Sequence, residues 1–537
     1  MQPDDQRPQP TPDITLPALT SGPMEILSSG PPEGGMPESG VPELAGRRRS
    51  RTPLILSIVM VLTLAAAGVA YAGLRLWYGS GAQPEDVTPA SAAAFLRLDL
   101  DPGISQGRRL ESLLNKLPLE AKDTQARLDL VEKSVLGDLG LSNLDFATDI
   151  KPWFGNRVGV AVWRSADKEP VALLLLASKD DAKATAALTK VRSRHDDGEL
   201  GFVLAQGYAL VARGERHAQA AAEAAAQEAK EHSLAKLKDF TAAVGTLPPN
   251  QTALGWLDLA AITKLMDVGR FGTPATLTGL PLAVDPLGLD DRTGHVVLGA
   301  QAVDNGIEAR VRVTGASTPP HAGRNVRPVL DALPGNSVVA AAISQDGSGW
   351  LNQSRNAVGI GGLFGPGFFD GPDSGDEMLD PQAAKQMEEA SRRFSDGMAA
   401  LLSSKLISAS LTTIGGDPPG LMLTAETDSD ASARKVVDGA TALGPLGLTA
   451  TTQGSRVEVK TRTYAPSGTL ADSALYREAM SGVPDTLFEA FFVDTTRLTA
   501  NETDRKTPRT LMPVKAVGAG FAVDGTDTVG LVRIVIK

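Results

Sequence analysis

The chain has 537 residues, of which 42% are hydrophobic and 21% charged, and its formal net charge is −11. This length and apolar content are enough for two or three domains with cores of their own. The negative charge argues against nucleic acid as a partner. The absence of cysteine excludes thiol catalysis, disulfide bonds and cysteine-based metal sites.

Residues 1–51 are rich in proline, glycine, serine and acidic residues, and few of them could build a core. This composition is typical of disordered segments. We expect a disordered cytoplasmic tail. A docking or phosphorylation role for its serines and threonines remains an open alternative.

Residues 52–74 contain no charged side chain, and as a helix they would extend about 34 Å, enough to cross a bilayer. Four arginines, at 47–49 and 51, precede this segment and place the N-terminus in the cytoplasm. The sequence therefore predicts one transmembrane helix over residues 52–78, at the cell membrane, with the remaining chain extracytoplasmic. Because Ala70-Tyr71-Ala72 fits a signal-peptidase site, cleavage after Ala72 is the alternative.

Residues beyond the apolar segment contain an internal repeat that is visible when the chain is aligned with itself. At an offset of 236 residues, Phe240 falls on Tyr476 and Asp258 falls on Asp494. Further upstream the offset is 249, and the Ala-rich run that starts at His217 can absorb the difference as an additional helix. We therefore predict two copies, at residues 79–325 and 326–537.

Both copies show the same series of hydrophobic patterns, namely a strand, a helix, a hairpin, a second helix, further strands and a closing hairpin. The expected hairpins are residues 157–163 with 170–177, 406–412 with 420–427, 295–313 and 517–537, and the expected helices after the first hairpins are 181–191 and 430–443. The fold class that follows is α+β: mostly antiparallel sheets with flanking helices on one face, in two tandem related copies, preceded by one transmembrane helix.

Asp258 and Asp494 occupy equivalent positions at the ends of apolar strands. An aspartate between a strand and a helix is most often a helix cap, so we expect a structural role for both. No Gly-x-Ser-x-Gly, phosphate-binding loop or His-Glu-x-x-His motif is present, and the five histidines are scattered. The sequence thus predicts no catalytic residues, no cofactor and no metal.

One segment, residues 358–369, is a Gly-rich apolar loop followed by acidic residues. Exposed Leu and Phe side chains cost free energy, so such a loop is expected to pack against its own domain, a partner or the membrane surface. The residues of this candidate contact loop are Leu363, Phe364, Phe368 and Phe369.

Several phrases resemble an actinobacterial family of single-pass membrane proteins with an extracytoplasmic domain of unknown function. They are the opening Pro89 to Pro102 with Phe95-Leu-Arg-Leu, the phrase Ile150-Lys-Pro-Trp-Phe-Gly with its alternating valines, and the repeated Leu-Ala units. The resemblance covers nearly all of residues 85–537. It implies a location in the cell envelope and carries over no catalytic residue.

The function that this sequence favours is a membrane-anchored, extracytoplasmic, non-catalytic binding module for a lipid, a glycan or a protein of the envelope. One alternative is a scaffold or signalling protein that couples an outer partner to the cytoplasmic tail. A second alternative is an envelope hydrolase, which would require paired acids that converge in a cleft.

Overall fold

The structure is a computed structural model. It describes residues 82–99, 104–114, 116, 146–164, 170–193, 198–213, 217–249, 251–266, 293–315, 323–344, 381–413, 419–442, 447–500 and 513–537. All structural statements below refer to these residues.

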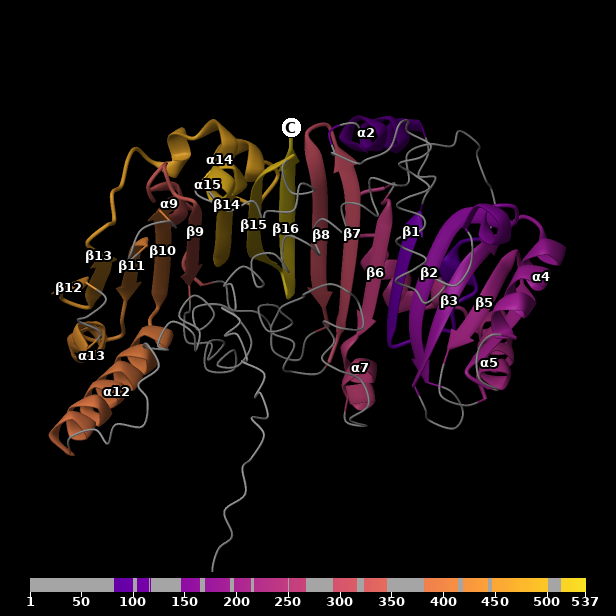
Figure 1. Ribbon diagram of the computed structural model, residues 1–537, viewed down its shortest axis with the longest axis horizontal. Coiled ribbons are helices and arrows are strands. Elements are labelled where there is room, and N and C mark those ends of the chain that lie inside the picture. Colours follow the sequence, from indigo (N-terminus) through magenta and orange to yellow (C-terminus); the bar gives the residue numbers. More distant parts are fainter. Residues whose placement is uncertain are drawn as a thin grey trace, which may run out of the picture. The chain divides into compact units, whose positions relative to one another are not determined.

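The described strands form one antiparallel sheet of sixteen strands (Figure 1). Their order across the sheet is β12-β13-β11-β10-β9-β14-β15-β16-β8-β7-β6-β1-β2-β3-β5-β4. In the first half of the chain the strands are β1 (Ala94–Asp99), β2 (Phe154–Arg164), β3 (Pro170–Ser178), β4 (Leu200–Ala205), β5 (Tyr208–Arg213), β6 (Ala253–Asp258), β7 (His295–Val303) and β8 (Gly306–Thr314). In the second half they are β9 (Val339–Ser344), β10 (Leu406–Thr413), β11 (Gly420–Glu426), β12 (Leu448–Gln453), β13 (Arg456–Thr461), β14 (Glu489–Asp494), β15 (Val514–Asp524) and β16 (Asp527–Ile536).

The two halves of the sheet repeat one strand order. Read from the junction outward, the first half runs 8-7-6-1-2-3-5-4 and the second half 16-15-14-9-10-11-13-12, so each strand corresponds to the one eight numbers later. The halves meet where β8 pairs with β16, from Val313 opposite Thr528 to Gly306 opposite Val535. The boundary expected at residues 325 and 326 falls between these two sets of strands, while the division into two domains stays a prediction.

The strands have apolar residues on both faces, because successive side chains point to opposite sides of a sheet. We call face A the side that carries Leu174, Ile534 and Phe491, and face B the side that carries Leu173, Val535 and Phe492. Directly paired residues of neighbouring strands lie on the same face, so the register extends these two sets across the whole sheet.

The described helices cover both faces. Core clusters on face A include residues of α2 (Ile104–Leu114), α4 (Asp181–Arg192), α7 (Leu259–Met266), α12 (Pro381–Leu402) and α13 (Asp430–Ala442). Clusters on face B include residues of α5 (Ala218–Glu231), η4 (Leu234–Lys236), α6 (Lys238–Val244), α9 (Arg327–Asp331), η10 (Leu470–Asp472) and α14 (Ala474–Ala479). The shorter elements are η1 (Pro84–Asp86), η3 (Phe146–Ile150) and α15 (Thr495–Ala500). Element η1 packs against β2 and β3, η3 against α4, and α15 against β15.

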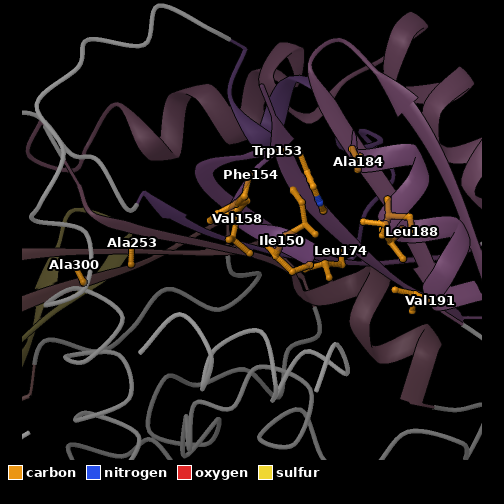
Figure 2. Packing of buried hydrophobic residues seen from close by; sticks show 14 of the residues in the cluster. Ile150, Trp153, Phe154, Val158, Leu174, Ala184, Leu188, Val191, Ala253 and Ala300 are labelled. Carbon is orange, nitrogen blue, oxygen red and sulfur yellow. The ribbon is translucent and has the colours of Figure 1, made fainter. Parts of the chain in front are cut away.

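The largest cluster on face A is continuous across the junction. It joins α4 and β3 of the first half to Val517 and Ile534 of the second. Figure 2 shows part of it, with Leu188 and Val191 of α4 directed toward Leu174 of β3. One core therefore belongs to strands from both halves.

The predicted fold class is wrong in two respects. We expected each of the two tandem copies to form its own sheet. The strands instead form a single sheet, because β8 of the first half pairs with β16 of the second. Helices lie on both faces rather than on one, because strands such as β3 have buried apolar residues on both sides. Among the described residues no helix is long and apolar enough to cross a membrane, and residues 52–78 lie outside them.

Candidate functional site

The candidate contact loop, with Leu363, Phe364, Phe368 and Phe369, lies outside the described residues. The capping role predicted for the two repeated aspartates is confirmed. Asp258 accepts a hydrogen bond from the backbone N–H of Ala261, at 2.9 Å. Asp494 accepts one from the backbone N–H of Thr496 at 3.0 Å and forms an ion pair with Arg497 at 3.0 Å.

No group of three or more histidine and acidic side chains within the described part of the chain is placed to hold a metal ion. Two other features can form a site: apolar side chains that water reaches, and polar side chains buried where the fold does not require them.

The first feature is an apolar patch on face A of β9 and β14. On these neighbouring strands every side chain on face B is buried, whereas every side chain on face A is half-buried. The six face-A residues are Val339, Ala341, Ile343, Glu489, Phe491 and Val493. We call these six residues the β9–β14 patch.

The register places the patch in three rows. Val493 lies opposite Val339, Phe491 opposite Ala341 and Glu489 opposite Ile343. A solvated face of an antiparallel sheet normally carries polar residues, in alternation with the apolar ones of the core face. Five of the six patch residues are apolar, so this part of face A has the character of a contact surface.

Within the described part of the chain, the helices that pack on β9 and β14 lie on the opposite face, and on face A Phe491 and Val493 lie at the margin of the core cluster. Leu330 of α9 and Tyr476 of α14 join Ala340 and Phe492 in a core cluster on face B. On face A, α12 and α13 pack over the neighbouring strands β10, β11 and β13. This distribution explains why the patch residues stay half-buried while their neighbours in sequence are buried.

Glu489 is the one ionisable group of the patch. It lies between Ile343 of β9 and Phe521 of β15, two apolar neighbours that offer no hydrogen bond. Burial raises the pKa of its carboxyl to about 7, because a charged group is disfavoured where little water surrounds it. The carboxyl can therefore change its charge near neutral pH.

Residues at the equivalent positions of the first half are apolar or glycine throughout. Glu489, Phe491 and Val493 correspond to Ala253, Gly255 and Leu257 at the offset of 236 residues. The half-buried carboxyl and the phenyl ring are thus particular to the second half and are not required by the shared topology.

The second feature is a buried polar stripe on face B of the first half. Arg97 of β1 forms an ion pair with Glu85 of η1, and both side chains are largely buried. Desolvation by burial raises the pKa of Glu85, against the opposing effect of the Arg97 charge. Tyr208 of β5 donates a hydrogen bond to the carbonyl of Ala82 at 2.9 Å, and burial raises its pKa as well.

The stripe continues onto β6 and β7. Trp256 stacks on His295 with ring centroids 4.5 Å apart, and His295 lies 3.6 Å from a carboxylate oxygen of Asp239. Four buried atoms of this stripe have no hydrogen-bond partner among the described residues: Glu85 Oε2, Arg97 Nε, Trp256 Nε1 and His295 Nδ1.

The second half has packing residues in place of this stripe. By strand order and register, Arg97, Trp256 and His295 correspond to Ala342, Phe492 and Ala516. At the offset of 245 residues that relates Arg97 to Ala342, Glu85 corresponds to Leu330. Those four residues are completely or almost completely buried. The ionic and aromatic groups of the stripe are therefore not a requirement of the fold.

Accessibility distinguishes the two features. The unpartnered atoms of the stripe are enclosed beneath η1, η4 and α6, whereas the β9–β14 patch is in contact with water. A ligand from solution can contact the side chains of the patch, whereas it cannot contact the four unpartnered atoms of the stripe without rearrangement. We therefore take the patch as the candidate site.

Sequence reasoning missed Phe491 and Glu489. The signal was present in the phrase Glu489-Ala-Phe-Phe-Val-Asp494, in which apolar residues occupy both alternating sets of a short strand. Such a run shows that both faces are apolar but not which face a helix will cover.

Comparisons with known proteins give a family but no activity. A family model described as "Protein of unknown function (DUF3352)" matches residues 54–350. No curated protein matches the chain. Two solved structures, of crystal forms III and I of TP0453, are each 12% identical to it over 45% of its length and over 84% and 83% of their own, with TM-scores of 0.24 and 0.22. Scores this low carry no argument about the fold or the site.

Proposed function

The chain belongs to the DUF3352 family of proteins of unknown function, and we propose that it is a non-catalytic binding module that holds a ligand with an extended apolar chain on the β9–β14 patch. The observation that carries this proposal is the set of half-buried apolar side chains at five of the six face-A positions of β9 and β14. The ligand class proposed is a lipid.

The dimensions of the patch favour a lipid chain over a protein partner. Three rows of residues span about 13 Å along a strand, and two neighbouring strands are about 5 Å apart. This is a narrow strip, suited to an extended alkyl chain. A standard protein–protein interface buries about 800 Å² on each partner, which exceeds what six half-buried side chains can offer.

Phe491 and Val493 are the expected main contacts, with Val339 and Ile343 on the neighbouring strand. Burying a Phe or Val side chain completely is worth about 1.5–3 kcal/mol. Because these side chains are already half-buried, each would contribute a fraction of that value. The ligand would therefore be held by several modest contacts and would exchange.

The location that the sequence predicts, outside the cytoplasm at the cell membrane, fits a lipid ligand and is part of this proposal. Actinobacterial origin and a duplication as the source of the repeated strand order also remain predictions.

The test is native mass spectrometry of the full chain, purified in mild detergent, followed by extraction of bound molecules. We expect a lipid in near-stoichiometric amount. Phe491→Ser should lower its amount severalfold, whereas Leu96→Ser should not. Leu96 is the matched control because it is half-buried on face A at the first-half position equivalent to Ala341.

Two results would contradict the proposal. One is a chain that carries no lipid and takes none up from added vesicles. The other is equal loss of lipid in the Phe491→Ser and Leu96→Ser variants, which would assign the binding to face A in general or to the detergent-accessible surface.

A further inference from the structure

An open sheet has two edge strands, and here they are β4 in the first half and β12 in the second. Among the described strands, β4 pairs only with β5, and β12 pairs only with β13. Each therefore has one row of backbone N–H and C=O groups that no strand of this sheet satisfies. Such edges attract further strands unless something blocks them.

The edge of β4 is blocked by a side chain. The amide oxygen of Gln219, in the first turn of α5, accepts a hydrogen bond from the backbone N–H of Phe202 at 3.1 Å. Its amide nitrogen donates to the carbonyl of the same residue at 3.2 Å. The Gln219 amide thus makes the two bonds that a neighbouring strand would make with Phe202.

Helix α5 can approach this closely because β4 has Gly201 beneath it. A Cβ at that position would lie 2.2 Å from the Cα of Gln219, so no other residue would leave room for the helix. The glycine and the glutamine together form a device that closes this edge.

Among the described residues, no side chain closes the edge of β12 in this way. Helix α5 follows β5 in the first half, whereas in the second half only residues 462–469 separate β13 from η10. The strand reads Leu-Thr-Ala-Thr-Thr-Gln and contains no proline, lysine or other charged residue of the kind that protects exposed edges. Thr449, Thr451, Thr452 and Gln453 are exposed.

We infer that the open edge of β12 pairs with β12 of a second copy of this chain, antiparallel and about a two-fold axis. The molecule itself contains the precedent, since its two halves already join edge to edge through β8 and β16. With the axis at Ala450, Thr449 of one copy lies opposite Thr451 of the other, on the same face of the joined sheet. Cross-strand threonine pairs are favourable, and no like charges oppose each other.

The predicted dimer is weak. A six-residue edge strand buries less surface than the roughly 1,200–2,000 Å² typical of stable complexes. We therefore expect a concentration-dependent equilibrium between monomer and dimer. This inference does not depend on the proposed lipid ligand.

The test is sedimentation velocity of the full chain in mild detergent over a wide concentration range. We expect a dimer that forms as concentration rises. Thr449→Lys combined with Thr451→Lys places like charges opposite each other across the axis and should weaken association at least tenfold. Gln219→Ala exposes the edge of β4 and should instead add a second mode of association, seen as species larger than a dimer.

Crosslinking provides an independent readout, because the chain has no cysteine of its own. Thr451→Cys should give a dimer with a short thiol-specific crosslinker, whereas Thr526→Cys, exposed in the turn between β15 and β16, should not. A chain that stays monomeric at every concentration, or a dimer that the double lysine variant leaves unchanged, would overturn the inference. A chain that stays monomeric would instead indicate that the edge of β12 pairs with an extended segment of another protein.

Discussion

At the scale of single residues, Glu489 links the protonation state of the molecule to its stability. Its carboxyl has an ordinary pKa of 4.5 in an unfolded chain and a pKa of about 7 in the folded one. Between these values the folded state binds more protons than the unfolded state. The free energy of unfolding must therefore fall as pH rises from 4.5 to 7, and this contribution becomes constant above that range.

The first prediction is that Glu489→Gln removes this contribution and raises the free energy of unfolding above pH 7. Because the side chain is half-buried, we expect a gain of about 1–2 kcal/mol rather than the full value of the pKa difference. Urea denaturation of both proteins between pH 4.5 and 8 measures it. Parallel curves for the two proteins would show that Glu489 titrates as an exposed carboxyl.

A second residue-level prediction concerns the Glu85–Arg97 pair. Arg97→Ala leaves the Glu85 carboxyl buried without its partner, a change that typically costs about 3–5 kcal/mol. The double variant Glu85→Leu with Arg97→Ala introduces the residues that the second half has at these positions, Leu330 and Ala342. Its free energy of unfolding should be within about 1 kcal/mol of that of the wild type, because apolar residues can often replace a buried ion pair.

Urea denaturation of the two variants at pH 7 measures this comparison. If the double variant loses as much stability as the single one, the pair holds η1 on the sheet in a way that apolar packing cannot replace.

At the scale of elements, the strands and helices were largely predictable and their partners were not. The hairpins at 157–177 and 406–427, and the helix at the Ala-rich run after His217, follow directly from hydrophobic alternation and helix propensity. The helices on both faces could have been anticipated from Leu173-Leu-Leu-Leu176, because four successive apolar residues in a strand require cover on both sides.

The pairing of β8 with β16 was beyond local reasoning. Both strands alternate as ordinary hairpin partners of β7 and β15, and nothing in their sequences specifies a neighbour more than 200 residues away. The same limit applies to the β9–β14 patch. Sequence shows that Phe491 and Phe492 are both apolar, but the packing of α9 and α14 decides which of the two remains accessible.

The third prediction tests the fit of α5 on β4. Gly201→Ala would place a Cβ against the backbone of Gln219, so the helix must move, at a cost of about 1–3 kcal/mol. Gly255→Ala is the control, because its Cβ would be 3.5 Å or more from other heavy atoms. Hydrogen exchange should show faster exchange in α5 for the first variant alone. Equal protection of α5 in both variants would show that the helix can shift away from β4 without a loss of stability.

At the scale of the whole molecule, the junction of the two halves decides whether the chain unfolds in one step or two. The core cluster on face A contains buried residues from both halves, and ion pairs cross the junction on face B. Arg312 of β8 pairs with Asp527 of β16 at 2.8 Å, and Arg533 of β16 lies 3.7 Å from Glu308 of β8.

The fourth prediction is that the sheet unfolds as one cooperative unit. A continuous core and a shared strand pair mean that neither half can unfold without exposing apolar surface of the other. With Trp77 and Trp350 replaced by Phe, tryptophans 153, 163 and 256 report on the first half, and a fluorophore on Thr526→Cys reports on the second. Both signals should give the same denaturation midpoint.

Glu308→Ala makes this prediction sharper. Glu308 is 5% exposed and accepts a hydrogen bond from Arg310 at 2.9 Å as well as facing Arg533. Removing the carboxyl takes away a negative charge that faces Arg533, whose side chain is only 17% exposed. The free energy of unfolding should therefore fall by about 1–3 kcal/mol. Because the residue lies at the junction, the midpoints reported by the tryptophans and by the fluorophore should fall together. If the two midpoints separate, each eight-stranded half has a stability of its own, and the pairing of β8 with β16 is a contact between two units rather than the centre of one.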